Sequence, residues 1–81
     1  DPPDMHVAVG GGLQATWRSY YGQDYVIVMN MSDQALKDQT IQITGTTASS
    51  AEVRGEGRAL SVSGGTITDS FGRYETHIYV L

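Results

Sequence analysis

The chain has 81 residues, no cysteine and a formal net charge of -4 at pH 7. This length suits one domain with a single small core, and the lack of thiols excludes disulfides, thiolate nucleophiles and thiolate metal sites. Its five Lys and Arg residues are scattered, which argues against nucleic acid as a partner, and no apolar run approaches the roughly 20 residues of a membrane helix.

The first four residues, Asp1 to Asp4, are rich in proline and are typical of a linker remnant. No signal peptide is visible in the sequence. We therefore expect a linker remnant over residues 1–4 and a single folded domain over residues 5–81.

Short alternating or β-branched runs recur about every ten residues along the rest of the chain, separated by clusters of Gly, Ser, Asn and Asp. They predict strands at residues 5–9, 13–19, 25–31, 37–44, 51–54, 59–63, 65–69 and 74–81. The segment 32–38 is too short for a convincing helix and is interpreted as a turn. The pattern predicts an all-β fold, an antiparallel β-sandwich (jelly-roll or Greek-key-like) of about eight short strands.

The predicted strand 25–31 is apolar on both faces. Val26 and Val28 share one face, and the other face is formed by Tyr25, Ile27, Met29 and Met31. A sandwich strand normally shows one polar face to water, so this strand is predicted to be central and covered twice. The second cover could be a loop, a partner domain or a ligand.

Catalytic chemistry finds little support in the sequence. Glycoside hydrolysis needs two carboxylates about 5–5.5 Å or 6.5–9.5 Å apart, whereas the acidic residues here fall in turns or beside arginine, as in Glu56-Gly57-Arg58. They are interpreted as solvated acids and ion pairs at the rim of the fold. A serine triad or a zinc site would have to use His6 or His77, and His77 is interpreted as a hydrogen-bonded structural residue of the last strand. We therefore predict no enzyme activity for the domain.

Four aromatic residues are crowded into a nine-residue segment around one predicted hairpin. Sugar C–H groups stack on aromatic faces, so a row of rings can hold a glucan chain, and neighbouring polar side chains can bond its hydroxyls. The candidate carbohydrate-binding residues are Trp17, Tyr20, Tyr21, Tyr25, Gln14 and Arg18. The alternation from Leu13 leaves a competing interpretation open, because it places Trp17 on the same face as the core.

Two further motifs have no support beyond chance. Calcium is common in sandwich domains, and Asp24, Asn30, Asp33 and Asp69 offer oxygens, but their spacing fits no calcium loop. The sequence Asn30-Met31-Ser32 matches a glycosylation sequon, and so short a pattern often occurs by accident. We predict no cofactor and no metal ligand.

The C-terminal segment from about Glu52 to Leu81 carries a moderately specific series of motifs. These are Gly55-Glu56-Gly57-Arg58, the Gly64-Gly65 turn, Thr68-Asp69-Ser70-Phe71, and Tyr74-Glu75-Thr76-His77-Ile78-Tyr79. The series resembles the C-terminal β-sandwich that follows the catalytic barrel in many bacterial glycoside hydrolases. One departure is Arg73, where the family would place a proline.

The resemblance implies a secreted, bacterial, non-catalytic carbohydrate-binding module attached to a glycoside hydrolase of the endoglucanase type. Together with the aromatic segment it predicts binding of β-glucan chains such as cellulose, mixed-linkage glucan or xyloglucan. An alternative is a structural domain that packs against the catalytic barrel and has no ligand of its own. A weaker alternative is an adhesion-type module that dimerises through an exposed edge strand.

Overall fold

The computed structural model describes residues 6–81, and the predicted linker remnant at residues 1–4 lies outside the described residues. Eight strands and no helix make up the described part of the chain. The strands are β1 (His6–Val9), β2 (Leu13–Tyr20), β3 (Gln23–Asn30), β4 (Leu36–Thr44), β5 (Ser50–Val53), β6 (Arg58–Ser61), β7 (Thr66–Phe71) and β8 (Thr76–Val80). The described residues include no helix that could span a membrane.

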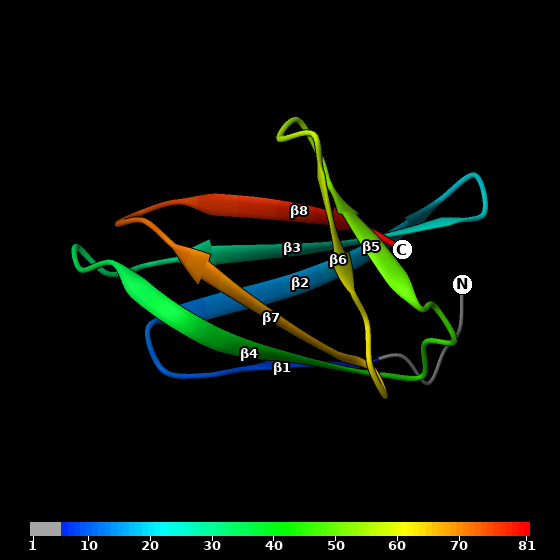
Figure 1. Cartoon of the computed structure of the whole chain (residues 1–81), viewed down its shortest axis with the longest axis horizontal. Helices are drawn as coiled ribbons and strands as arrows, with labels where there is room; N and C mark the ends of the chain where they lie inside the picture. Colours follow the sequence, from blue (N-terminus) through cyan, green and yellow to red (C-terminus); the bar gives the residue numbers. More distant parts are fainter. Residues whose placement is uncertain (1–5) are drawn as a thin grey trace.

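The strands form two antiparallel sheets of unequal size. One sheet has the order β1-β4-β7 and the other has the order β2-β3-β8-β5-β6. Figure 1 shows β2, β3 and β8 running side by side along the length of the molecule, with β1, β4 and β7 as the second layer. The fold is an all-β sandwich, as the sequence predicts.

The predicted strands agree with the observed ones to within about two residues at most ends, which is the usual uncertainty of strand boundaries. The segment 32–38 forms no helix, and its last residues, from Leu36, already belong to β4. A positive φ of 52° at Asp38 and a register shift between Leu36 and Gln39 mark a bulge there.

The core lies between the two sheets and follows the two-residue period of each strand. In β3, Val26 and Val28 are fully buried, and in β4 the alternate residues Ile41 and Ile43 face them from the other sheet. The remaining buried apolar residues are Leu13, Ala51, Val53, Val62, Ile67, Phe71 and Tyr79. β-branched side chains dominate this core, which is why the strands could be recognised from the sequence.

Two tight hairpins use pairs of residues with positive φ. The β2–β3 hairpin turns at Tyr21 and Gly22, with φ of 51° and 75°, because Tyr20 pairs with Gln23. The two strands therefore reach closer to the turn than the predicted ranges 13–19 and 25–31. The connection from β6 to β7 turns at Gly64 and Gly65, with φ of 58° and 81°, and joins the two sheets.

Gly65 is expected to be far more sensitive to substitution than Gly64. A Cβ at Gly65 would collide with the carbonyl oxygen of Ile43, whereas a Cβ at Gly64 would meet nothing within 4 Å. Gly64→Ala should cost only the strain of positive φ, about 1 kcal/mol in the free energy of unfolding. Gly65→Ala should cost at least about 3 kcal/mol because the turn must also shift away from Ile43. Urea denaturation of both variants checks this, and equal losses would contradict the described turn.

Candidate functional site

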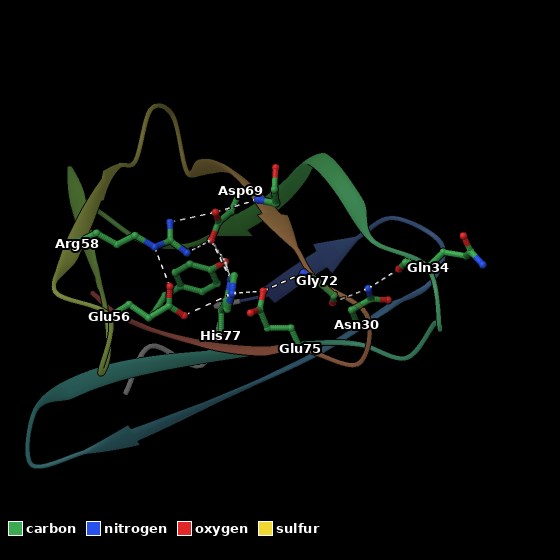
Figure 2. Close-up of polar contacts among 10 residues, drawn as sticks. Asn30, Gln34, Glu56, Arg58, Asp69, Gly72, Glu75 and His77 are labelled. Atoms are coloured by element: carbon green, nitrogen blue, oxygen red, sulfur yellow. Dashed lines mark hydrogen bonds and ion pairs between the residues drawn. The ribbon is translucent and has the colours of Figure 1, made fainter.

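A group of charged and polar side chains lies between the two sheets, centred on Asp69 (Figure 2). Asp69 is on β7 of the three-stranded sheet and points inward between the buried residues Ile67 and Phe71. Its partners lie on β6 and β8 of the five-stranded sheet. We call this group the Asp69 network; its other members are Glu56, Arg58, Glu75, His77 and Tyr79.

The Asp69 carboxylate accepts hydrogen bonds on both oxygens. Arg58 donates through Nη1 to Oδ1 at 3.1 Å and through Nη2 to Oδ2 at 3.0 Å, and Tyr79 Oη donates to Oδ2 at 2.7 Å. The backbone N–H of Ser70 donates to Oδ1 at 2.8 Å. A two-pronged contact with guanidinium fixes the plane of the carboxylate as well as its position.

His77 is buried, with 2% of its side chain exposed, and both of its ring nitrogens face oxygen atoms. Nδ1 lies 2.9 Å from Asp69 Oδ2 and 3.2 Å from Tyr79 Oη. Nε2 lies 2.9 Å from Glu75 Oε1 and 3.4 Å from Glu56 Oε2. The ring also stacks on buried Phe71, with a centroid separation of 4.3 Å. The predicted role of His77 as a hydrogen-bonded structural residue is confirmed.

The network lowers the pKa values of Asp69 and Glu75, which favours the ionised carboxylates, and raises that of Tyr79, which favours the neutral phenol. Burial alone would raise the pKa of Asp69, but hydrogen bonds from Arg58, Tyr79 and the Ser70 N–H outweigh it and lower that pKa. The Gly72 N–H, and after it His77, lower the pKa of Glu75 despite some desolvation. Burial and the contact with Asp69 raise the pKa of Tyr79, so the phenol remains protonated and donates.

The interpretation of these acids as solvated acids and ion pairs at the rim is confirmed for Glu56, which pairs with Arg58 at 2.8 Å, and is wrong for Asp69. Asp69 has only 8% of its side chain exposed, and the two glutamates pair with Arg58 and His77. Both nitrogens of the buried ring face protein oxygens, and the network joins β7 of one sheet to β6 and β8 of the other.

A second polar residue, Asn30, is buried and fully bonded. Its Nδ2 donates to the carbonyl oxygens of Gln34 at 2.8 Å and Gly72 at 3.0 Å, and its Oδ1 accepts from the Ser32 N–H at 2.9 Å. Asn30 therefore ties the turn after β3 to the turn after β7. A side chain buried and bonded in this way offers no amide to a glycan, which removes the sequon from consideration in the folded domain.

The acidic residues considered for calcium are engaged in separate places. Asp24 accepts a hydrogen bond from Ser19 at the β2–β3 hairpin, and Asp69 lies in its network. Within residues 6–81 no three His, Cys, Asp or Glu side chains are grouped in a way that could hold a metal ion.

The outer face of the five-stranded sheet is the largest feature left without an explanation. The register places Tyr25 beside Val80, and Ile27 beside Ile78, with Met29 one step further along β3. All five are half-buried and point away from the second sheet. We call them the outer-face stripe. The prediction that β3 is central and apolar on both sides is correct, but no second cover is found among the described residues.

A shallow hollow of about 300 Å³ lies at the hairpin end of this stripe. It is lined by Arg18, Tyr20, Tyr25, Ile27, Arg54 and Ile78. Arg18 pairs directly with Tyr25 across β2 and β3, and the Arg54 guanidinium lies 5.9 Å from the centroid of the Tyr25 ring. Polar residues of β2 and β5, among them Thr16 and Glu52, border the stripe on either side.

The structure divides the predicted carbohydrate-binding residues between two sides of β2. Arg18, Tyr20 and Tyr25 line the hollow, and Gln14 is exposed on the same face beside Met29. Trp17 points the other way and packs, half-buried, against the core. Tyr21 is 91% exposed at the hairpin tip and stacks at a tilt on Tyr20. The four rings therefore do not form a common platform, because successive strand residues face opposite sides.

Sequence reasoning placed Ile27 on the same face as Tyr25 but missed Arg54 and Ile78 as neighbours of Tyr25. Arg54 and Ile78 lie far away in the sequence and come close only through the order β3-β8-β5. The Arg54 N–H donates to the Ile78 carbonyl oxygen at 2.8 Å and so holds the arginine at this position. No local feature of the sequence predicts this strand order.

Comparison with known proteins supports the fold but does not assign the chain to a family. No family model matches the sequence, and no curated protein matches it. A solved structure with a similar fold is that of Gan42B, a GH42 β-galactosidase, with a TM-score of 0.63 and 16% sequence identity. The match covers 98% of this chain and 10% of the β-galactosidase chain. At this identity the likeness shows a shared fold, which in that protein is a small part of a much longer chain.

The stabilising effect of Asp69 should depend on pH. Its pKa is lowered on folding from the ordinary value of 3.8, so the ionised carboxylate stabilises the fold above about pH 4, and this contribution is lost as the pH falls through the lower folded pKa. Asp69→Asn should therefore be clearly less stable than the native protein at pH 7, and the difference should shrink at pH 2.5.

Urea denaturation at the two pH values measures this difference. Asp33→Asn, at an exposed turn position, is the matched control and should change stability little at either pH. A loss for Asp69→Asn that is the same at pH 2.5 as at pH 7 would contradict the ionised network.

Proposed function

We propose that this chain is a non-catalytic accessory domain of a glycoside hydrolase, and that it docks on the catalytic domain through the outer-face stripe. The association with a glycoside hydrolase is supported by the motifs of the C-terminal segment and by the shared fold with a small part of a GH42 β-galactosidase chain. Like the enzymes that its motifs resemble, the whole protein is expected to be bacterial and secreted.

The observation that carries the docking role is the composition of the outer face. Its centre is aliphatic, with Ile27, Met29, Ile78 and Val80 half exposed on adjacent strands, and its borders are polar. An apolar centre with a polar rim is the usual anatomy of a protein interface. Sugars, in contrast, stack on aromatic faces, which the centre of this stripe does not offer. A contiguous apolar patch on a small domain also indicates a contact surface.

The domain alone should self-associate through this stripe, since nothing covers it in the described residues. The variants Ile27→Glu and Ile78→Glu should each be monomeric at concentrations at which the native protein associates, because each places a charge at the centre of the face. Thr16 is the direct cross-strand neighbour of Ile27 but lies on the polar border of the stripe. The variant Thr16→Glu is therefore the matched control and should associate like the native protein. Sedimentation velocity over a concentration series checks this.

A native protein that stays strictly monomeric at millimolar concentration would contradict docking through the stripe. The same holds if Ile27→Glu and Thr16→Glu reduce association equally. Circular dichroism on each variant confirms that the sandwich is intact.

A second candidate function is the binding of β-glucan chains. The aromatic residues around the β2–β3 hairpin predict this function from the sequence. It is favoured by one observation, the joint position of Tyr20, Tyr25 and Arg18 around the hollow. With Trp17 on the core side, the tyrosines available for stacking at the hollow are Tyr20 and Tyr25, and the affinity for a neutral chain is expected to be weak.

Affinity electrophoresis in gels containing soluble β-glucans tests this second function. Glucan binding predicts retardation of the native protein, loss of that retardation in Tyr20→Ala, and no change in Tyr74→Ala. Tyr74 is the control because it is similarly exposed but does not line the hollow. Equal migration of native protein and Tyr20→Ala on every β-glucan would reject the function.

A further inference from the structure

We propose that the hollow at the hairpin end of the outer face is a binding site for a carboxylate-bearing sugar, such as a uronic acid residue of an acidic glycan. The choice of a sugar among carboxylates rests on the accessory role proposed above. The preference for a carboxylate does not, since it follows from the residues that line the hollow.

The hollow concentrates positive charge on a protein that is negative overall. Arg18 and Arg54 are two of only five Lys and Arg residues in a chain of net charge -4. The other lining residues, Tyr20, Tyr25, Ile27 and Ile78, carry no acidic group. Glu52 lies on the same face beside Val80 but outside the lining.

Neither guanidinium is neutralised within the described part of the chain. The ion pairs found among residues 6–81 belong to Arg58 and His77, and none involves Arg18 or Arg54. The contrast with Arg58 is informative, since that arginine is held between two carboxylates. Two exposed arginines that share a hollow and have no acidic partner among residues 6–81 are suited to an anion that comes from outside.

The geometry adds a stacking surface to the charge. Arg18 is the direct cross-strand neighbour of Tyr25, and Arg54 lies over the Tyr25 ring at 5.9 Å, so the two cations bracket one aromatic side chain. Tyr20 is 62% exposed and forms another wall of the hollow. A pyranose ring can rest against the tyrosines and the apolar floor of Ile27 and Ile78, while a carboxylate on its C6 reaches a guanidinium. No covalent step is involved.

The test compares three small probes by nuclear magnetic resonance titration of the 81-residue chain at low salt. Methyl β-D-glucuronide carries the carboxylate, methyl β-D-glucoside has a hydroxymethyl group in its place, and acetate has the charge without the sugar ring. The glucuronide is expected to shift the amides of Arg18, Tyr25 and Arg54 and to bind at least about tenfold tighter than either other probe. Its binding should weaken as NaCl is raised from 20 to about 200 mM.

The variants separate the hollow from general surface charge. Arg18→Gln and Arg54→Gln should each weaken glucuronide binding about tenfold, while Arg73→Gln, an exposed arginine of the β7–β8 turn, should leave it unchanged. Equal binding of glucuronide and glucoside, equal binding of glucuronide and acetate, or no binding at all would each overturn the proposal.

Tyr25, Ile27 and Ile78 belong to both the stripe and the lining of the hollow, so the hollow is open only where the stripe is uncovered. The titration is therefore run at a concentration at which sedimentation velocity finds the chain monomeric, and docking is tested separately by the sedimentation of Ile27→Glu.

Discussion

The two sheets of this sandwich are joined by a buried ionic contact as well as by apolar packing. Asp69 projects from β7 of the smaller sheet, and its carboxylate is held by Arg58 and Tyr79 of the larger one. A charge in this position is tolerated only because each oxygen is bonded, and removing one partner leaves the others unpaired in a poorly solvated space. Phe71 of β7 stacks on His77 of β8 beside this contact, so apolar packing and hydrogen bonding join the same two strands.

The two sheets differ in width, since one has three strands and the other five. Ala51 and Val53 of β5 are nonetheless buried in the core. The Gly64-Gly65 connection and the side chain of Arg58 join β6 of the larger sheet to β7 of the smaller one. The apolar face that has no partner among the described residues is the outer one, where the stripe and the hollow lie.

The sequence was a good guide to the strands and a poor one to the sites. Alternation in β3 and β4 follows directly from burial on one side of each strand, so residues such as Val26 and Ile41 could be assigned to the core. The same rule, applied to β2, separates Trp17 from Tyr20, in agreement with the competing interpretation that placed Trp17 on the core side. The binding roles proposed for Arg18, Tyr20 and Tyr25 remain predictions.

The Asp69 network and the hollow could not be predicted in full, for a different reason. The members of the network lie on the consecutive strands β6, β7 and β8, and the alternation of β7 places Asp69 on the same face as Ile67 and Phe71. The inward direction of Asp69 could therefore have been predicted, but its pairing with Arg58 across the two sheets could not. Arg54 reaches Tyr25 only because β8 lies between β3 and β5, and the pattern of strands along the sequence does not reveal that order.

A double-mutant cycle between Asp69 and Tyr79 measures the contact between the sheets most directly. The free energies of unfolding of Asp69→Asn, Tyr79→Phe and the double variant, at pH 7, give the coupling between the two side chains without the costs that each change has alone. A hydrogen bond of 2.7 Å to a buried carboxylate predicts a coupling of at least about 1 kcal/mol. Additive effects, with a coupling within about 0.5 kcal/mol of zero, would contradict the central role given to this contact.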